Sequence, residues 1–174
     1  MEGSVLVNEA RKIIRSYLER GGISDNTEIL DRKCGGVFVT LHKKGELRGC
    51  IGTVGGVKLK EGLKRAAIGV IHDPRFPPLE LDELKEVDVE VSVLTPPVRV
   101  AEPEKEVVIG RDGIIVQKGG RSGLLLPQVP VEEGWNLGEF LAYGCLKAGL
   151  QEGCWRDPGT IIFKFAADVF REDS

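Results

Sequence analysis

The stretch that sets the architecture of this chain runs from residue 36 to residue 54 and reads GVFVTLHKKGELRGCIGTV. Two runs with β-branched and apolar residues, 36–43 and 46–54, flank a turn-like segment that contains Gly45. Strand-forming runs on both sides of a short glycine-containing turn predict a β-hairpin. We therefore expect a sheet to be built outward from this hairpin.

The second half of the hairpin holds an unusual group of residues. Cys50 stands between glycines, and Arg48 precedes it by two positions. Because alternate residues of a strand share a face, the pattern predicts Arg48 beside Cys50. A nearby cation lowers the pKa of a thiol and favours the reactive thiolate. The alternative interpretation is a small, unreactive residue at a close approach of the backbone.

Regular elements are expected on both sides of the hairpin. Apolar residues at helical spacing predict a helix over 5–18, with Ser4 as its cap and Gly21 after its end. A second helix is expected over 58–71, because Pro74 follows it and cannot continue the hydrogen-bond ladder. Alternating valines predict a half-buried strand over 87–93.

The order of elements then recurs. After a proline-rich connection at 96–107, strands are expected at 113–118, 123–129 and 160–165, with a helix at 136–149. Both halves read strand, strand, helix, strand. We therefore predict an internal duplication and an α+β fold with mostly antiparallel sheets. The two similar halves, roughly 1–97 and 98–174, form one domain in this interpretation.

Composition restricts the class of protein. The chain has 174 residues, 41% of them hydrophobic and 29% charged, which is typical of a globular protein. A net charge of −3 argues against non-specific nucleic-acid binding. No apolar run approaches the length of a membrane span, and no secretory leader is evident, so we expect a cytoplasmic protein without a membrane partner. 

The cysteines and histidines show no metal-binding spacing, and no nucleotide-loop motif is present, so no metal or cofactor is predicted. The cysteines are interpreted as free thiols, with one of them, in the last predicted helix, facing the core. They are Cys34, Cys50, Cys145 and Cys154.

A second group of candidate site residues follows the second predicted helix, in the sequence HDPRFPPL at 72–79. His72 is a candidate base for Cys50, although the negative end of a helix is itself a sufficient structural reason for a histidine. Arg75 is expected to be a second cation beside Arg48, with Asp73 orienting it. Two arginines directed at one place predict an anionic ligand, a carboxylate or a phosphate. The structural alternative is a rigid proline turn.

The remaining candidates come from the hairpin itself. Gly49, Gly52 and Thr53 are predicted to line the ligand site, because glycines between a strand and a helix can expose backbone amides to an anion. Their spacing matches neither nucleotide-binding pattern, so close backbone approach is the competing explanation. Glu46 is an alternative base.

Seven segments together resemble the AMMECR domain family. In chain order they are GVFVTL, ELRGCIGT, DPRFPPL, VSVLTPP, IGRDGIIV, RSGLLLPQV and GWNLGEFLAYGCLKAGL. The resemblance extends from about residue 5 to 170, and the hallmark LRGCIG is complete at residues 47–52. It implies an α+β fold with two lobes and a cleft between them, a functional site where the hallmark lies near that cleft, and Memo-type or radical-SAM proteins as partners. It does not name a reaction.

Two hypotheses follow. In the first, the chain is an enzyme with Cys50 as nucleophile, His72 or Glu46 as base, and Arg48 and Arg75 holding an anionic substrate. In the second, it is a non-catalytic adaptor whose recognition cleft includes Cys50 only because the residue is small. The substitution Cys50→Ser separates the two, since only a covalent enzyme requires the sulfur.

Overall fold

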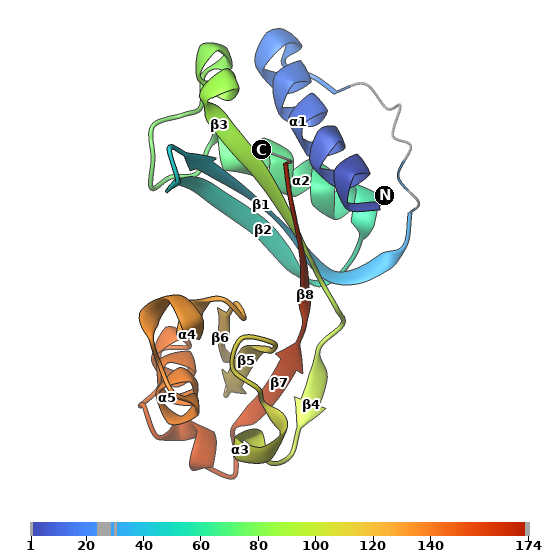
Figure 1. Cartoon of the computed structure of the whole chain (residues 1–174). Coiled ribbons are helices and arrows are strands. Elements are labelled where there is room, and N and C mark those ends of the chain that lie inside the picture. Colours follow the sequence, from blue (N-terminus) through green and yellow to red (C-terminus); the bar gives the residue numbers. More distant parts are fainter. Residues whose placement is uncertain (1, 24–28, 30, 173–174) are drawn as a thin grey trace. The chain divides into compact units, whose positions relative to one another are not determined.

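A computed structural model of the chain describes residues 2–23, 29 and 31–172, and it separates into two compact units (Figure 1). The first unit contains Met1–Leu94 together with Asp168–Ser174, and the second contains Thr95–Ala167. The C-terminal seven residues thus belong to the first unit, whereas the sequence suggested two consecutive lobes.

The first unit is built on a four-stranded sheet with the order β2-β1-β3-β8. Its strands are β1 (Lys33–Lys43), β2 (Glu46–Lys58), β3 (Val87–Leu94) and β8 (Ala167–Arg171). Strand β1 runs antiparallel to both β2 and β3. Lys44 and Gly45 join β1 to β2 in the left-handed conformation, with φ of 52° and 78°, which suits the twist of a two-residue hairpin. The predicted hairpin is confirmed.

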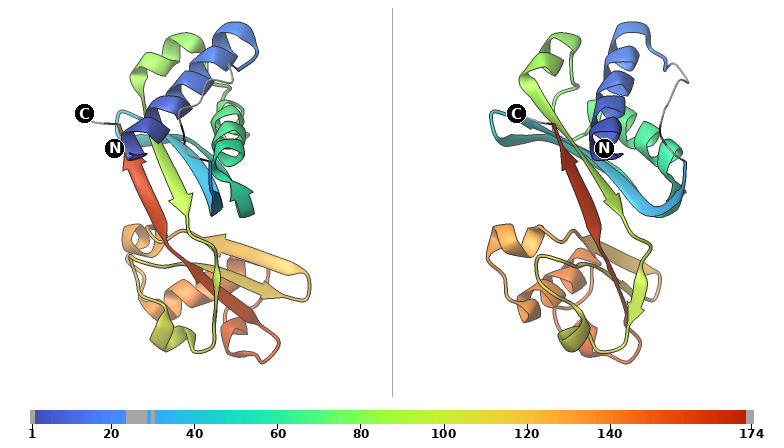
Figure 2. Two further views of the ribbon diagram at one scale, coloured as in Figure 1. Left: turned by 90° about the vertical axis from the view of Figure 1, so that its right-hand side faces the viewer. Right: turned by 45° about the vertical axis from the view of Figure 1, so that its right-hand side comes forward.

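Helices α1 (Glu2–Arg20) and α2 (Leu59–Ile71) cover one face of this sheet (Figure 2). Val37, Val39 and Leu41 of β1 point toward them and are fully buried. Alternation places Phe38 and Thr40 on the opposite, helix-free face. Both predicted helices are confirmed, but α1 begins at Glu2, so Ser4 lies within the helix and is not its cap.

Two further elements complete the first unit. A short 3₁₀ helix, η1 (Leu81–Glu86), precedes β3 and was not expected from the sequence. Arg11 of α1 donates hydrogen bonds to the Glu172 carboxylate and to the Leu84 and Val87 carbonyl groups. Glu172 in turn accepts a hydrogen bond from the Val89 amide at 2.8 Å. These contacts attach the C-terminal segment to α1 and β3.

The second unit has its own four-stranded sheet, with the order β4-β7-β5-β6 and antiparallel pairing. Its strands are β4 (Val98–Val100), β5 (Gly113–Lys118), β6 (Arg121–Leu125) and β7 (Ile161–Phe165). Its helical elements are α3 (Pro103–Glu106), α4 (Val129–Glu133), α5 (Leu137–Lys147) and η2 (Cys154–Arg156).

Helix α5 supplies the core of the second unit. Asn136 and Glu139 form the predicted capping box at its start, and Phe140 and Leu141 are fully buried. Cys145 is also buried, as expected, but it forms a disulfide with Cys154. The interpretation of these two cysteines as free thiols is wrong, because the turn after α5 returns η2 to the helix. Cys34 and Cys50 are free.

The two sheets repeat one topology. In each unit a hairpin is followed by a helix and a third strand, and the orders β2-β1-β3 and β6-β5-β7 are equivalent. The chain then leaves each third strand and supplies the fourth strand of the other sheet: β4 follows β3, and β8 follows β7. The predicted repeat of strand, strand, helix, strand is present, and the two repeats exchange their last strands.

Candidate functional site around Cys50

Asp73 and Arg75 hold both main-chain groups of Cys50. The Cys50 amide donates a hydrogen bond to Asp73 Oδ2 at 2.9 Å, and the Cys50 carbonyl accepts one from Arg75 Nη2 at 3.1 Å. Strand β2 lies at the edge of its sheet, so these two side chains satisfy backbone groups that a neighbouring strand would otherwise bind. We call Asp73 and Arg75 the edge clamp.

The two side chains of the edge clamp also bind each other. Asp73 Oδ1 accepts hydrogen bonds from the Arg75 amide and from Nε, both at 3.1 Å, and Oδ2 accepts one from Nη2 at 2.7 Å. The Asp73 side chain is 1% exposed, whereas that of Arg75 is 55% exposed. The hydrogen bonds from Arg75 and from the Cys50 amide hold the pKa of Asp73 well below its usual range, against the opposing effect of burial. The clamp is therefore a neutral pair at physiological pH.

The Cys50 thiol lies on the helix-free face, opposite Thr40 of β1. The Thr40 hydroxyl donates a hydrogen bond to Cys50 Sγ at 3.3 Å. Burial, together with the charges of Asp73 and Glu90, raises the pKa of the Cys50 thiol against the lowering effects of this hydrogen bond and of Arg75. The environment therefore favours the protonated thiol, which is opposite to the lowered pKa expected from the sequence.

Arg48 does not accompany Cys50, because a β-bulge separates them. Leu41 pairs with Gly49 while His42 pairs with Leu47, so Arg48 is an extra residue in β2. Arg48 binds Glu83 of η1 instead, with Nε–Oε1 and Nη2–Oε2 distances of 2.7 and 3.0 Å. The prediction that strand alternation places Arg48 beside Cys50 is wrong.

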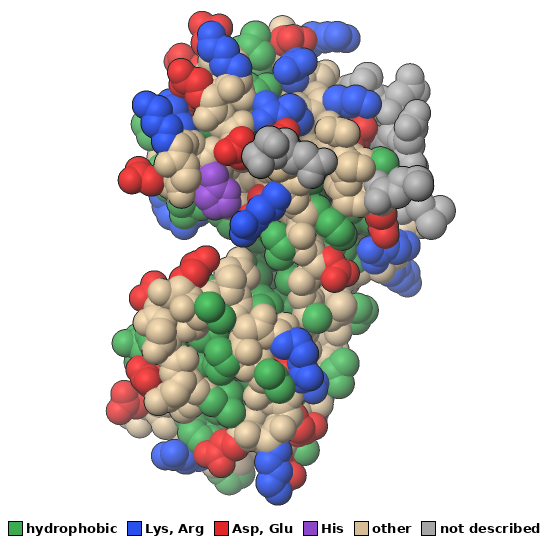
Figure 3. Space-filling view, viewed as in Figure 1, with side chains coloured by type: hydrophobic (Ala, Val, Ile, Leu, Met, Phe, Trp, Pro, Cys, Tyr) green, Lys and Arg blue, Asp and Glu red, His purple; other side chains and the backbone are tan. Residues whose placement is uncertain are grey.

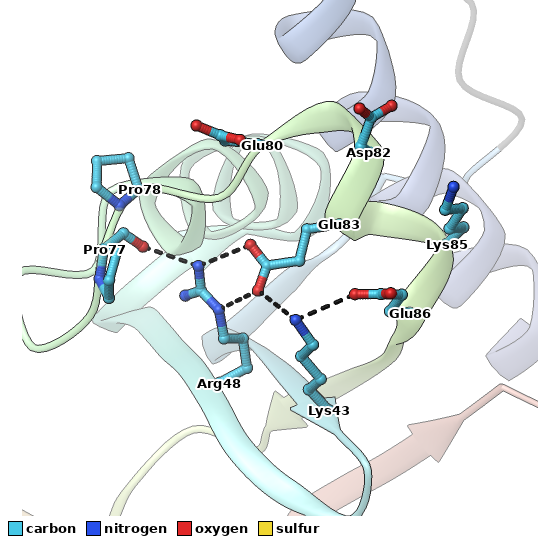
Figure 4. Close-up of a pocket in the computed structure, with 9 residues that line it drawn as sticks. All are labelled: Lys43, Arg48, Pro77, Pro78, Glu80, Asp82, Glu83, Lys85 and Glu86. Carbon is cyan, nitrogen blue, oxygen red and sulfur yellow. Dashed lines mark hydrogen bonds and ion pairs between the residues drawn. The ribbon is translucent and has the colours of Figure 1, made fainter.

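Arg48 lines an open hollow of about 510 Å³ beside η1 (Figure 4). Its Nη2 also donates to the Pro77 carbonyl at 2.8 Å, and Lys43 lies between Glu83 and Glu86 at 3.2 and 3.1 Å. In all, the lining contains three basic and four acidic side chains, with two prolines: Lys43, Arg48, Lys85, Glu80, Asp82, Glu83, Glu86, Pro77 and Pro78. This hollow therefore has no excess of positive charge with which to attract an anion.

Phe76 is the point at which the two predicted arginines approach each other. The guanidinium carbons of Arg48 and Arg75 lie 5.9 and 5.5 Å from the centre of its ring. Both distances are within the range of cation–π attraction. The two arginines thus flank the same ring, and each guanidinium is paired with its own carboxylate. That they hold an anion together stays a prediction.

His72 is directed away from the thiol. It is the residue that ends α2, and its ring lies edge-on to Tyr17 of α1, with 5.8 Å between ring centres. The recorded partners of Cys50 are Thr40 and the edge clamp. The structure therefore does not bring together the candidate dyad of Cys50 and His72.

The glycines of the hallmark make room for side chains. A Cβ atom on Gly52 would lie 2.3 Å from the Phe38 ring, and one on Gly49 would lie 3.0 Å from Val70 Cγ2. Both glycines lie within the continuous strand β2 and not in a loop that could bind an anion. Close packing therefore explains why these positions hold glycine.

The other two hairpin candidates are placed without a clear chemical role. Thr53 Oγ1 is buried and has no hydrogen-bond partner in the described part of the chain. Glu46 lies at the exposed start of β2, where it pairs in register with Lys43.

Three side chains that contribute to this surface were not among the residues predicted from the sequence. Thr40 contacts Cys50, and Glu83 binds Arg48. Phe76 lies beside both Arg48 and Arg75. Thr40 could have been found, because a hairpin register places it across from Cys50. Glu83 could not, because η1 lacks a periodic apolar pattern.

Basic and acidic side chains are interspersed over the face drawn in Figure 3. Among the described residues, no three metal-ligating side chains gather at one point. None of the helices in the same residues combines the length and apolar character needed to cross a bilayer.

Comparison with known proteins gives a consistent result. A protein from Methanopyrus kandleri is 50% identical over 185 residues, which cover 99% of this chain and 89% of that protein. A protein from Thermococcus gammatolerans is 47% identical, covering 98% of this chain and 90% of that protein. The crystal structure of an uncharacterised Pyrococcus horikoshii protein has a TM-score of 0.88 and 46% identity, and it covers 99% of this chain and 92% of that chain. The AMMECR1 family model matches residues 7–170, and the chain belongs to the AMMECR1 family.

Proposed function

We propose that this AMMECR1-family chain is a recognition module, and that its binding surface is formed by the β2 edge at Cys50, the edge clamp and Phe76. One observation carries the proposal. Asp73 and Arg75 form hydrogen bonds with the Cys50 backbone, and among the described residues no base contacts the sulfur. The residues that an enzyme would use to activate a thiol therefore serve to shape a surface.

The electrostatics of the site support this choice over a covalent enzyme. Burial raises the pKa of Cys50, so the thiolate is a minor species near neutral pH. Arg48 and Arg75 are both matched with carboxylates, so neither is an uncompensated cation. Rigid, neutral groups with one partly exposed arginine and an aromatic ring resemble the composition of protein-recognition surfaces.

The experiment is residue-resolved alkylation of Cys50 with iodoacetamide as a function of pH. A recognition module should give an apparent pKa at or above the value of about 8.5 for a free thiol. An apparent pKa below about 7.5 would overturn the proposal and restore the nucleophile hypothesis, with Arg75 as the cation beside it. Cys34 is the internal reference, because it is buried and lies in the same unit.

The identity of the partner remains a prediction. The family resemblance implies Memo-type or radical-SAM proteins as partners, and the sequence pattern predicts the cytoplasm as the compartment. The small anionic ligand expected from the sequence would have to bind at Arg75, because Arg48 is only 11% exposed and is held by Glu83.

A further inference from the structure

The edge of β2 is open immediately after the edge clamp. The Cys50 amide and carbonyl point away from β1. Because the direction of these groups alternates along a strand, the amides and carbonyls of Gly52 and Val54 also point away from β1. No hydrogen bond to the amide or carbonyl of either residue is recorded within the described parts of the chain. Beyond them, Gly55 and Gly56 form a second bulge, with φ of 102° and 77°. The open edge is therefore the segment from Gly52 to Val54.

We propose that this open edge binds the C-terminal end of an extended peptide, which adds to the sheet as a strand antiparallel to β2. The proposal deepens the proposed function, on which it rests, by naming the class of partner. Strand addition to an exposed edge uses main-chain hydrogen bonds for affinity and side-chain contacts for specificity. Gly52 and Val54 offer two N–H donors and two carbonyl acceptors in the required alternation.

The edge clamp determines the direction and the end of the peptide. A peptide strand antiparallel to β2 passes Val54 first and then Gly52. At Cys50 it meets Arg75, which already donates a hydrogen bond to the Cys50 carbonyl. Its main chain must stop there. Among the described residues, Arg75 Nη1 has no hydrogen-bond partner, and the side chain is 55% exposed, so a terminal carboxylate can accept a hydrogen bond from it. Asp73 opposes this negative charge, but its oxygens already accept four hydrogen bonds from Cys50 and Arg75.

The side chains beside the edge indicate which residues fit. The Phe38 ring fills the space above Gly52, and Val54 is 47% exposed on the same face of the strand. The peptide residues opposite Gly52 and Val54 would lie against these apolar groups. We therefore expect apolar residues at the penultimate position and two positions before it.

A second copy of the chain is a less suitable occupant. Two β2 edges paired antiparallel about Thr53 would bring Cys50 and its clamp against the Gly55–Gly56 bulge of the other copy. The Arg75 side chain lies beside Cys50, where the β2 strand of the second copy would have to run. A three-residue edge also offers far less than the roughly 1,200 Å² of a stable protein interface.

The test uses the full chain, labelled with ¹⁵N, and the peptide acetyl-KTVTVT with a free C-terminal carboxylate. Amide hydrogen exchange is measured at each residue. Gly52 and Val54 should exchange freely in the dilute protein and about tenfold more slowly with saturating peptide. Thr53 should be protected throughout, because its amide faces β1. The same peptide with a C-terminal amide should bind about fivefold more weakly.

Two controls isolate the main-chain contacts. Methylation of the peptide nitrogen at the penultimate valine removes the donor to the Gly52 carbonyl and should abolish the protection. In the protein, Val54→Pro removes an outward-facing N–H and should abolish binding, whereas Val54→Ala should retain protection of Gly52. If Val54→Pro does not fold, the methylated peptide still decides the question.

Three results would overturn the inference. They are slow exchange of Gly52 and Val54 in the dilute free protein, protection that appears when the protein alone is concentrated, and no protection at millimolar peptide. Equal binding of the acid and amide peptides would overturn the role of Arg75. None of these readouts depends on the reactivity of Cys50, so failure here is distinguishable from failure of the proposed function.

Discussion

The hydroxyl of Thr40 donates a hydrogen bond to the sulfur of Cys50 across the β1–β2 pair, at 3.3 Å. Among the recorded influences on the thiol, this hydrogen bond and Arg75 are the two that favour the thiolate, while burial and the nearby carboxylates oppose it. Thr40 is therefore the larger of the two influences that lower the pKa of the thiol.

The first prediction concerns this hydrogen bond. Thr40→Val preserves the shape of the side chain but removes the donor that lowers the pKa of Cys50, so the apparent pKa of Cys50 should be higher than in the native chain. Alkylation of Cys50 followed by mass spectrometry across pH measures the change. Thr160→Val is the control, because its hydroxyl donates to the Cys154 carbonyl in the other unit. A lower apparent pKa in Thr40→Val would contradict the assignment of the donor.

The second prediction concerns Asp73 and acid stability. The pKa of Asp73 is lower in the folded chain than in the unfolded chain, where it is about 3.9. Its contribution is therefore complete above that unfolded value and is lost as the pH falls toward the folded value. Asp73→Asn should lower the free energy of unfolding by about 2 kcal/mol at pH 7. The difference from the native chain should narrow below about pH 4.

Urea unfolding followed by far-UV circular dichroism at several pH values tests this. Asp157→Asn is the matched control, because Asp157 pairs with Lys118 at 3.0 Å and both side chains are exposed. It should change stability by less than about 1 kcal/mol. A constant gap between Asp73→Asn and the native chain from pH 7 to pH 3 would argue against the edge clamp as the source of the shifted pKa.

The third prediction concerns the packing of Gly52. Gly52→Ala would place a methyl group 2.3 Å from the Phe38 ring, so the free energy of unfolding should fall by about 1–3 kcal/mol. Gly22→Ala, which has open space around its Cβ position, should change it by less than about 0.5 kcal/mol. Phe38→Leu combined with Gly52→Ala should recover part of the loss. If Gly52→Ala were as stable as Gly22→Ala, close packing would not explain this hallmark glycine.

The fourth prediction concerns the disulfide between Cys145 and Cys154, which closes a loop across nine positions of sequence. Loss of such a crosslink costs about 2–3 kcal/mol in the chain-entropy account. Urea unfolding of Cys154→Ser should therefore show a lower midpoint for the second unit. Tryptophan fluorescence reports this unit selectively, because the only two tryptophans, Trp135 and Trp155, are both in it. An unchanged midpoint, with Cys34→Ser as control, would indicate that the crosslink is thermodynamically neutral.

Local signals in the sequence predicted most of the regular elements. The turn at Lys44 and Gly45, the left-handed Gly21 after α1, and the capping box of Asn136 and Glu139 each depend on residues within one turn of one another. Their conformational preferences act at short range, so a single sequence suffices to identify them. The hallmark likewise identified the strand in which the candidate site lies.

The errors that concern side-chain partners depend on tertiary contacts and not on local conformational preference. The bulge that separates Arg48 from Cys50 is stabilised by Glu83, 35 positions away, and no periodicity in the hairpin reveals it. The disulfide requires η2 to return to α5. Asp73 and Arg75 were correctly chosen as a pair, but their role on the Cys50 backbone follows only from the fold of the loop that precedes η1.

The exchange of fourth strands has a consequence for dissecting the gene. The second unit is encoded without interruption at residues 95–167, whereas the first is encoded in two pieces, so a stop codon after residue 94 removes β8 from the first sheet. The two crossings of the chain are adjacent, since the Thr95 amide donates to the Ala166 carbonyl at 2.9 Å. A short glycine linker that replaces residues 95–167 should therefore rejoin Leu94 to Asp168 and yield a contiguous reading frame for the unit that carries Cys50.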